Sequence, residues 1–98
     1  SLGRNHVCDG IAQKDGKTYL FEVKREFSLS NFDRTLGRLV ALQAILEDKR
    51  YVNLNFILIL ISDQKIEADK MNELYHKARL VIQNFEIVNY TLDEIANR

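Results

Sequence analysis

The stretch "CDGIAQKDGKTYLFEVKRE", residues 8–26, decides how the chain begins to fold. Two largely apolar segments flank the dipeptide Asp15-Gly16. Asp-Gly favours a two-residue type I′ turn, because both central residues of that turn need positive φ. We therefore predict a β-hairpin with one strand over 5–13 and a second over 18–27.

The two-residue turn also fixes the register of this hairpin, because loop length determines which residues face each other. Side chains alternate between the faces of a strand, so residues directly opposite each other share a face. The predicted partners are Lys14 with Lys17, Gln13 with Thr18, Ile11 with Leu20, Asp9 with Glu22, and Val7 with Lys24.

The facing carboxylates of Asp9 and Glu22 need a physical explanation. Side chains directly opposite have Cβ atoms about 5 Å apart, and like charges there destabilise the pair. A divalent cation between them removes the conflict, and Mg²⁺ prefers one or two carboxylates, retained waters and substrate phosphates. Lys24 lies one diagonal step from Asp9 on the same face. The register thus predicts a metal site with an adjacent cation.

The alternative is that Glu22 and Lys24 line the wet face of an edge hairpin, where the lysine discourages edge-to-edge pairing. Glu-x-Lys is a short pattern, and Glu47-Asp48-Lys49 also fits it at a predicted helix end. The conjunction of Asp9, Glu22 and Lys24, followed by a helix and a buried strand, favours the metal site.

After the hairpin, the pattern predicts a helix over 31–48. Ser30 with Asp33 approximates a capping box at its start. The expected inner stripe consists of Leu36, Leu39, Val40 and Leu46. The apolar run "LNFILILI", residues 54–61, predicts a central strand that is covered on both faces.

A second helix is predicted over 66–84, with an inner stripe of Met71, Leu74, Ala78, Val81 and Phe85. A short strand over 86–90 follows, and Thr91 with Glu94 forms a capping box for a last helical turn. The element order β-β-α-β-α-β-α predicts an α/β domain: an antiparallel hairpin joined to a sheet completed by right-handed crossovers.

Composition sets the broad class of the protein. The 98 residues make one small domain, 1–98, and 14 basic residues balance 14 acidic ones. A nucleic-acid binder with this balance needs a local basic patch or an assembled dimer. The longest apolar run is far shorter than the roughly 20 residues that span a bilayer. The single cysteine, Cys8, forms no intrachain disulfide, and we expect a cytoplasmic protein without membrane association.

The segment "HVCDGIAQKDGKTYLFEVKRE" resembles the PD-(D/E)XK superfamily of metal-dependent nucleases, which includes restriction endonucleases and Holliday-junction resolvases. The matching residues are Asp9, then a turn, then Glu22-Val23-Lys24 at the end of an apolar strand. The following element order extends the resemblance over nearly the whole chain. Two features depart from it: Cys8 replaces the name-giving proline, and the first helix of the family core is not found. We expect that helix upstream, on a partner chain, or missing.

The resemblance implies a restriction endonuclease-like fold and a Mg²⁺-dependent deoxyribonuclease, with an endonuclease favoured over an exonuclease. Asp9, Glu22 and the backbone carbonyl of Val23 would hold Mg²⁺, or Mn²⁺ in its place. Lys24 would assist the attacking water, and Gln43 is a lesser catalytic candidate. The candidate DNA contacts are Lys24, Arg25, Arg34 and Arg38. Expected partners are DNA, a second copy in a homodimer, and fused helicase, ATPase or specificity domains.

Two other functions stay open. One is a catalytically inactive nuclease-like scaffold that binds nucleic acid or protein, which zero net charge and the absent first helix favour. The other is an ordinary α/β interaction domain with a charged edge hairpin, which follows if Asp9 and Glu22 point to opposite faces.

Overall fold

A computed structural model describes residues 9–25, 28–51 and 53–96 of the chain. Its element order, β-β-α-β-α-β-α, confirms the order predicted from sequence and the α/β class. The elements are β1 (Gly10–Lys14), β2 (Lys17–Lys24), α1 (Leu29–Asp48), β3 (Leu54–Ser62), α2 (Ala68–Arg79), β4 (Phe85–Thr91) and α3 (Leu92–Ala96).

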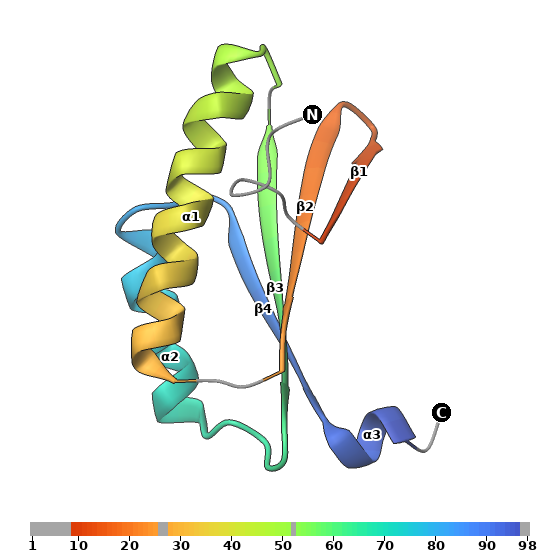
Figure 1. The fold of residues 1–98 in the computed structure, drawn as a ribbon, viewed down its shortest axis with the longest axis vertical. Helices are drawn as coiled ribbons and strands as arrows, with labels where there is room; N and C mark the ends of the chain where they lie inside the picture. Colours follow the sequence, from red (N-terminus) through yellow and green to blue (C-terminus); the bar gives the residue numbers. More distant parts are fainter. Residues whose placement is uncertain (1–8, 26–27, 52, 97–98) are drawn as a thin grey trace.

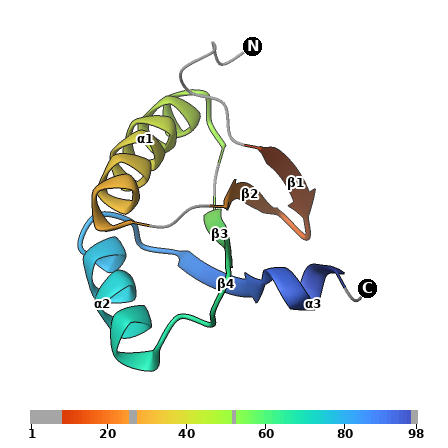
Figure 2. The same ribbon diagram turned by 60° about the horizontal axis from the view of Figure 1, so that its bottom comes forward.

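The strands form one mixed four-stranded sheet in the order β1-β2-β3-β4. β1 is antiparallel to β2, whereas β2, β3 and β4 run parallel to one another. Helices α1 and α2 lie on the same face of this sheet (Figures 1 and 2). Because β2, β3 and β4 are parallel, all three finish at the same end of the sheet. The hairpin turn lies at the opposite end (Figure 1).

The hairpin has the predicted register. Lys14 pairs with Lys17 and Ile11 pairs with Leu20. Both turn residues have positive φ, 53° at Asp15 and 76° at Gly16, as a type I′ turn requires. The strands are shorter than predicted, because β1 begins at Gly10 and β2 ends at Lys24. Residues 5–8 and 26–27 of the predicted strands lie outside the described residues.

Helix α1 begins two residues earlier than predicted, at Leu29. The cap is Ser28, whose side-chain oxygen accepts a hydrogen bond from the backbone N–H of Asn31 at 3.2 Å. The prediction of Ser30 as the cap was wrong. Two serines with the same capping chemistry stand two residues apart, and the one that meets the third helical N–H takes the role.

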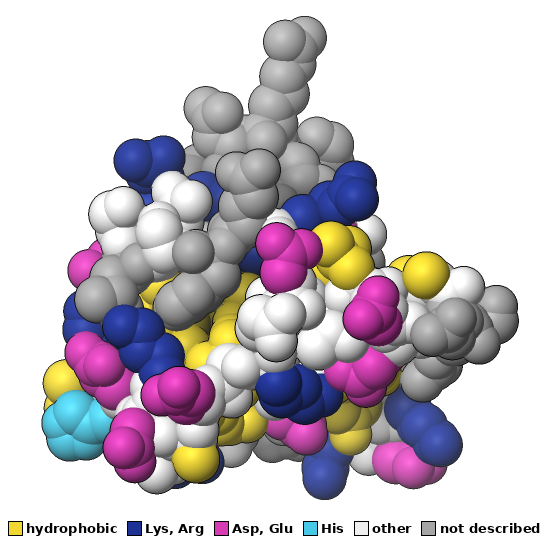
Figure 3. Space-filling model, turned by 90° about the horizontal axis from the view of Figure 1, so that it is seen from below, with side chains coloured by type: hydrophobic (Ala, Val, Ile, Leu, Met, Phe, Trp, Pro, Cys, Tyr) yellow, Lys and Arg dark blue, Asp and Glu magenta, His cyan; other side chains and the backbone are white. Residues whose placement is uncertain are grey.

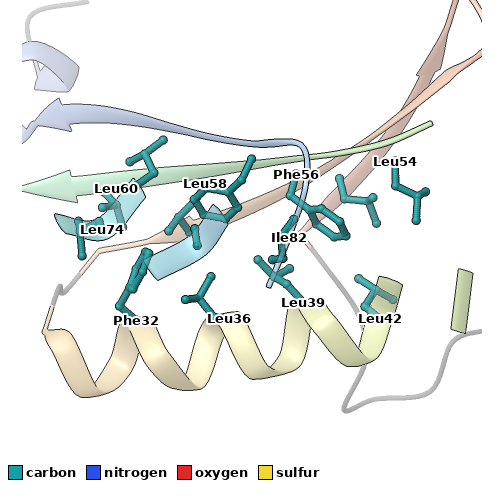
Figure 4. Close-up of a cluster of buried hydrophobic side chains, with 14 of the residues drawn as sticks. Phe32, Leu36, Leu39, Leu42, Leu54, Phe56, Leu58, Leu60, Leu74 and Ile82 are labelled. Atoms are coloured by element: carbon teal, nitrogen blue, oxygen red, sulfur yellow. The ribbon is translucent and has the colours of Figure 1, made fainter. Parts of the chain in front are cut away.

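The buried stripe of α1 contains the predicted Leu36, Leu39 and Leu46, but it includes Phe32 and Leu42 and leaves out Val40. Val40 is 38% exposed, whereas the neighbouring Leu42 is buried. A helix turns by about 100° per residue, so an apolar residue between two inward positions can still face water. Figure 4 shows how this stripe packs under the sheet. The labelled side chains from α1 are Phe32, Leu36, Leu39 and Leu42; those from the sheet are Leu54, Phe56, Leu58 and Leu60.

Strand β3 is an interior strand, as predicted, but the expected coverage of both its faces is not met by α1 and α2. The side chains of Phe56, Leu58 and Leu60 are buried on the face that these helices cover. The alternate residues Ile57 and Ile59, on the other face, are half-buried. A continuous apolar run predicts an interior strand, but it does not tell which segment covers each face.

Helix α2 ends at Arg79, five residues before the predicted end. The inner positions Leu74 and Ala78 are buried as predicted, but Val81 is exposed and Ile82 is buried in its place. Phe85 is buried too, yet it opens β4 rather than closing the helix. The apolar pattern continues beyond the end of α2 because Ile82, in the turn that follows the helix, is also buried in the core.

The predicted capping box at Thr91 is confirmed. The backbone N–H of Thr91 donates to Glu94 Oε1 at 3.0 Å, and the N–H of Glu94 donates to Thr91 Oγ1 at 3.2 Å. Lys65 Nζ also reaches the same carboxylate at 3.1 Å. Among the described residues, no helix is long and apolar enough to cross a membrane.

Core packing predicts a large difference between two alanine substitutions. Leu58→Ala empties a fully buried site and should lower the free energy of unfolding by about 2–5 kcal/mol. Val40→Ala, on the exposed side of α1, should change it by less than about 0.5 kcal/mol. Urea denaturation measures both, and equal effects would contradict the described packing.

The capping contacts predict the titration of Glu94. Its pKa lies below the ordinary value of 4.5, first because of the Thr91 backbone N–H and then because of Lys65. Since folding lowers this pKa, the stabilisation is present above the unfolded value and is lost as the pH falls through the folded one. Carboxyl NMR should find Glu94 titrating below 4.5, and Lys65→Ala should move the pKa upward. A Glu94 pKa at or above 4.5 would contradict the cap.

Candidate active site

The candidate site is built on the last residues of β2. Alternation along this strand places Glu22 and Lys24 on the same face as Leu20, and that face is covered by the helices. Glu22 is only 6% exposed, whereas Lys24 is half-buried. The wet-face alternative therefore does not describe Glu22, because its carboxylate is placed beside the core.

A buried carboxylate needs a cation or several donors, since removing an ionised group from water costs several kcal/mol. Arg38 of α1 donates from Nη2 to Glu22 Oε1 at 2.7 Å. Lys24 Nζ lies 3.3 Å from the same oxygen. The three side chains form an ion triad that joins β2 to α1. Sequence alone predicts a DNA contact for Arg38 and not this pairing, although an acid beside Leu20 on a core face requires a cation from the covering helix.

Asp9 meets β2 in a different way from the one predicted. Its carboxylate Oδ2 accepts a hydrogen bond from the backbone N–H of Val23 at 2.7 Å. Its own N–H donates to the carbonyl of Phe21 at 2.9 Å. The cross-strand ladder begins only at Gly10, so Asp9 is not a strand residue facing Glu22. Beyond the ladder the Val23 N–H needs another acceptor, and the aspartate supplies it. The predicted pairing of Val7 with Lys24 lies outside the described residues.

The same edge of β2 also carries the carbonyl oxygen of Val23. Within a strand, the N–H and C=O of one residue point to the same neighbour. The N–H of Val23 points to Asp9, so its carbonyl faces that edge as well. The Asp9 carboxylate thus lies against the peptide link between Glu22 and Val23, whose two side chains leave on opposite faces.

These groups are hard oxygen donors, which suit Mg²⁺ or Mn²⁺. They comprise two carboxylates and one carbonyl, and Mg²⁺ typically completes such a set with waters and substrate oxygens. Among the described residues, no three His, Cys, Asp or Glu side chains gather in one place. Oxygen donors of this kind suit a Mg²⁺ that keeps most of its waters, and the cations on Glu22 Oε1 compete with any metal for that oxygen.

Of the remaining candidates, only Arg38 joins the site. Arg25 follows β2 in an exposed bend, and Arg34 is exposed one helical turn before Arg38. Gln43 instead donates from Nε2 to Glu47 Oε1 at 2.8 Å and lines a cavity beside Leu54. Leu54 is four residues before Leu58, the partner of Glu22, which is about 13 Å along the strand. Gln43 is therefore not brought to the candidate site.

The surface at this end of the molecule has mixed charge. Figure 3 views the end at which the parallel strands finish, and acidic and basic side chains are interspersed there with hydrophobic surface. Several of the nearby cations are already paired, as Lys65 is with Glu94 and Lys77 with Asp33. This end of the described structure does not form a continuous basic surface for a polyanion.

Comparison with known proteins identifies no relative of this chain. No family model, no curated protein and no solved structure matches it. The resemblance to the PD-(D/E)XK superfamily consequently stays a prediction that is carried by Asp9, Glu22, Val23 and Lys24 and by the element order.

The ion triad predicts unequal effects for two arginines on α1. Arg38→Met leaves the buried Glu22 with Lys24 alone, and should lower the free energy of unfolding by about 1–3 kcal/mol. The half-exposed guanidinium is screened by water, so the lower part of this range is expected.

The matched control is Arg34→Met, one turn earlier on the same helix, which should change stability by less than about 0.5 kcal/mol. Urea denaturation of both variants at neutral pH provides the measurement. Equal destabilisation by the two substitutions would mean that the Glu22–Arg38 contact carries no special weight.

Proposed function

We propose that the protein is a metal-dependent nuclease that hydrolyses phosphodiester bonds in DNA, with Mg²⁺ held by Asp9 and Glu22. The observation that supports this proposal is the arrangement at the end of β2. Asp9 bonds the backbone N–H of Val23, and the residues on either side of Val23 are Glu22 and Lys24, whose side chains pair at 3.3 Å. The same arrangement is expected for members of the PD-(D/E)XK superfamily.

Each residue of the candidate site has a role that follows from its position. Asp9 is exposed at the strand edge, where its second oxygen can bind a cation while Oδ2 keeps the Val23 N–H. Glu22 contributes a carboxylate from the core side, and the carbonyl of Val23 adds a neutral oxygen. A bound Mg²⁺ would supply Lewis-acid polarisation of the phosphate and lower the pKa of attacking water.

Lys24 and Arg38 supply positive charge next to the carboxylates. Lys24 is half-buried and lies 3.3 Å from Glu22 Oε1, so it can orient an attacking water or stabilise charge that develops on the phosphate. Arg38 fixes the Glu22 side chain from α1, which makes it a positioning residue. The direct DNA contact predicted for Arg38 stays a prediction beside this role.

A second function is favoured by the same ion triad. Arg38 and Lys24 already neutralise Glu22 Oε1, and a carboxylate with two cationic partners is stable without a metal. In this alternative the chain is a catalytically inactive nuclease-like scaffold that binds nucleic acid or protein. The two functions differ in whether Asp9 and Glu22 bind a divalent cation.

The nuclease proposal predicts loss of cleavage in three conservative variants. Asp9→Asn keeps a carbonyl oxygen for the Val23 N–H, and Glu22→Gln keeps the side-chain volume; both remove metal-binding charge. Lys24→Met removes the ammonium group, and a group that assists proton transfer contributes roughly 100-fold or more. Mg²⁺-dependent cleavage of labelled DNA should fall at least to that extent in each variant.

The controls are Asp69→Asn and Lys70→Met on α2, which remove the same charges away from the site and should leave cleavage unchanged. Full activity in Asp9→Asn or Lys24→Met would exclude the proposed site.

Isothermal titration with Mg²⁺ and Mn²⁺ separates the two functions. Binding that is lost in Glu22→Gln supports the nuclease, whereas no binding by the unsubstituted protein supports the scaffold.

A further inference from the structure

A second site lies at the opposite end of the sheet, between the hairpin turn and the segment that follows α1. The two regions line an open surface cavity of about 580 Å³. The N–H of Thr18 donates to the Asn53 carbonyl at 3.2 Å, and Asn53 Nδ2 donates to the Gly16 carbonyl at 3.3 Å. These bonds hold Asn53 against the hairpin. Figure 1 shows the hairpin turn and the end of α1 at the same end of the sheet.

Positive charge is concentrated around this cavity. Lys14 and Lys17 line it from the hairpin, Lys49 and Arg50 line it from the end of α1, and Asp15 is the one acid in its lining. None of these four basic side chains makes an ion pair with a described residue, in contrast to Lys24, Arg38, Lys65 and Lys77. The chain has no net charge, so this cluster is a local surplus.

Two of the four cations lie close enough to repel each other. Lys14 and Lys17 are direct cross-strand partners, and like charges in that position are destabilising. Cations at the end of a helix interact favourably with its dipole, which accounts for Lys49 and Arg50 but not for the two hairpin lysines. The neighbouring Glu47 accepts a hydrogen bond from Gln43 at 2.8 Å and lines a different cavity. An anion among the four cations would relieve the repulsion.

An aromatic ring stands beside the cations. α1 ends in a turn in which Arg50 has a φ of 68°, and the N–H of Tyr51 donates back to the Leu46 carbonyl at 3.0 Å. This fixes the backbone of Tyr51, whose side chain is 38% exposed. Tyr51 and Arg50 form a wall shared by the basic cavity and an adjacent cavity of about 360 Å³.

The adjacent cavity carries side-chain amides rather than charges of one sign. Gln43, Asn53 and Asn84 line it together with apolar side chains of the core edge. The Oε1 atom of Gln43 is buried and accepts no hydrogen bond from any described residue. The amide nitrogens are bonded within the protein: Gln43 Nε2 to Glu47, Asn53 Nδ2 to the Gly16 carbonyl and Asn84 Nδ2 to the Leu54 carbonyl. The exposed ring of Tyr51 is therefore the group that can receive a base, by stacking on its face.

We propose that these two cavities together bind a single-stranded stretch of nucleic acid. Lys14, Lys17, Lys49 and Arg50 contact its phosphates, and an unpaired base stacks on Tyr51 beside the amides. The phosphates of a duplex can contact the basic side chains, but its bases are stacked inside and none is free to stack on Tyr51.

The inference rests on the proposed nuclease function in one respect, because it names the form of the substrate. Lys17 and Lys24 are seven residues apart on β2, which is about 23 Å. A substrate with a single-stranded segment would be held at the hairpin end of the sheet and cut at the other end. Binding itself needs no metal and no cleavage, so it is tested separately.

The test measures fluorescence anisotropy of a labelled oligothymidine strand and of a duplex of equal length, in EDTA, over a series of salt concentrations. The single strand should bind more tightly than the duplex. Tyr51→Leu should weaken binding of the single strand by roughly 5- to 100-fold and leave duplex binding unchanged. Equal affinity for both forms, or no effect of Tyr51→Leu, would overturn the proposal.

The salt dependence tests the phosphate contacts. Each lysine–phosphate contact with a single strand contributes a slope of about −0.7 in the plot of log affinity against log salt. Lys49→Ala should reduce the slope by about that amount, whereas the matched control Lys70→Ala on α2 should not change it. The proposal would be overturned if Lys49→Ala left the salt slope unchanged or if Lys70→Ala reduced it as much. Displacement of the strand by equimolar thymidine monophosphate would also overturn it.

The two proposals fail in distinguishable ways. Strand binding that depends on Tyr51 and Lys49, without metal-dependent cleavage, would contradict the nuclease and support this site on a scaffold. Cleavage that depends on Asp9 and Lys24, with no effect of Tyr51→Leu on binding, would support the nuclease and overturn this site.

Discussion

The contact between Glu22 and Arg38 is the interaction on which the candidate site depends. Strand alternation places the Glu22 carboxylate on the face of the sheet that packs against α1, where an unpaired charge would cost several kcal/mol. The guanidinium of Arg38 meets it at 2.7 Å, and Lys24 approaches the same oxygen. These contacts fix the position of α1 relative to the end of β2. The charged residues Glu22 and Lys24, which are unexpected in an apolar strand, are thus part of the packing between α1 and the sheet.

Much of the fold could be predicted because its signals are local. The Asp15-Gly16 turn fixed the hairpin register through backbone conformation, and the Thr91–Glu94 capping box was visible as a spacing of three residues. The errors arose where several local choices were equivalent. Ser28 rather than Ser30 caps α1, and Ile82 rather than Val81 enters the core. In these cases tertiary packing selects one of two chemically similar residues.

The candidate site could be predicted in composition but not in geometry. Counting from the turn brought Asp9 to the level of Glu22, and the structure does place Asp9 against the peptide link that follows Glu22. Counting did not reveal that the ladder begins only at Gly10, which frees the aspartate to bond the Val23 N–H at the strand edge. Arg38 was missed as a partner because the contact spans 16 positions and depends on how α1 lies across the sheet.

The two ends of the sheet have different chemistry. At the end of β2, carboxylates pair with cations. At the hairpin end, four cations that make no ion pair with a described residue line a cavity together with Tyr51. NMR with substoichiometric Mn²⁺ measures whether Asp9, Glu22 and Val23 hold a divalent cation. We expect selective broadening of the amide signals of residues 9–10 and 22–24. Broadening centred on other carboxylates, or none at all, would contradict this metal site.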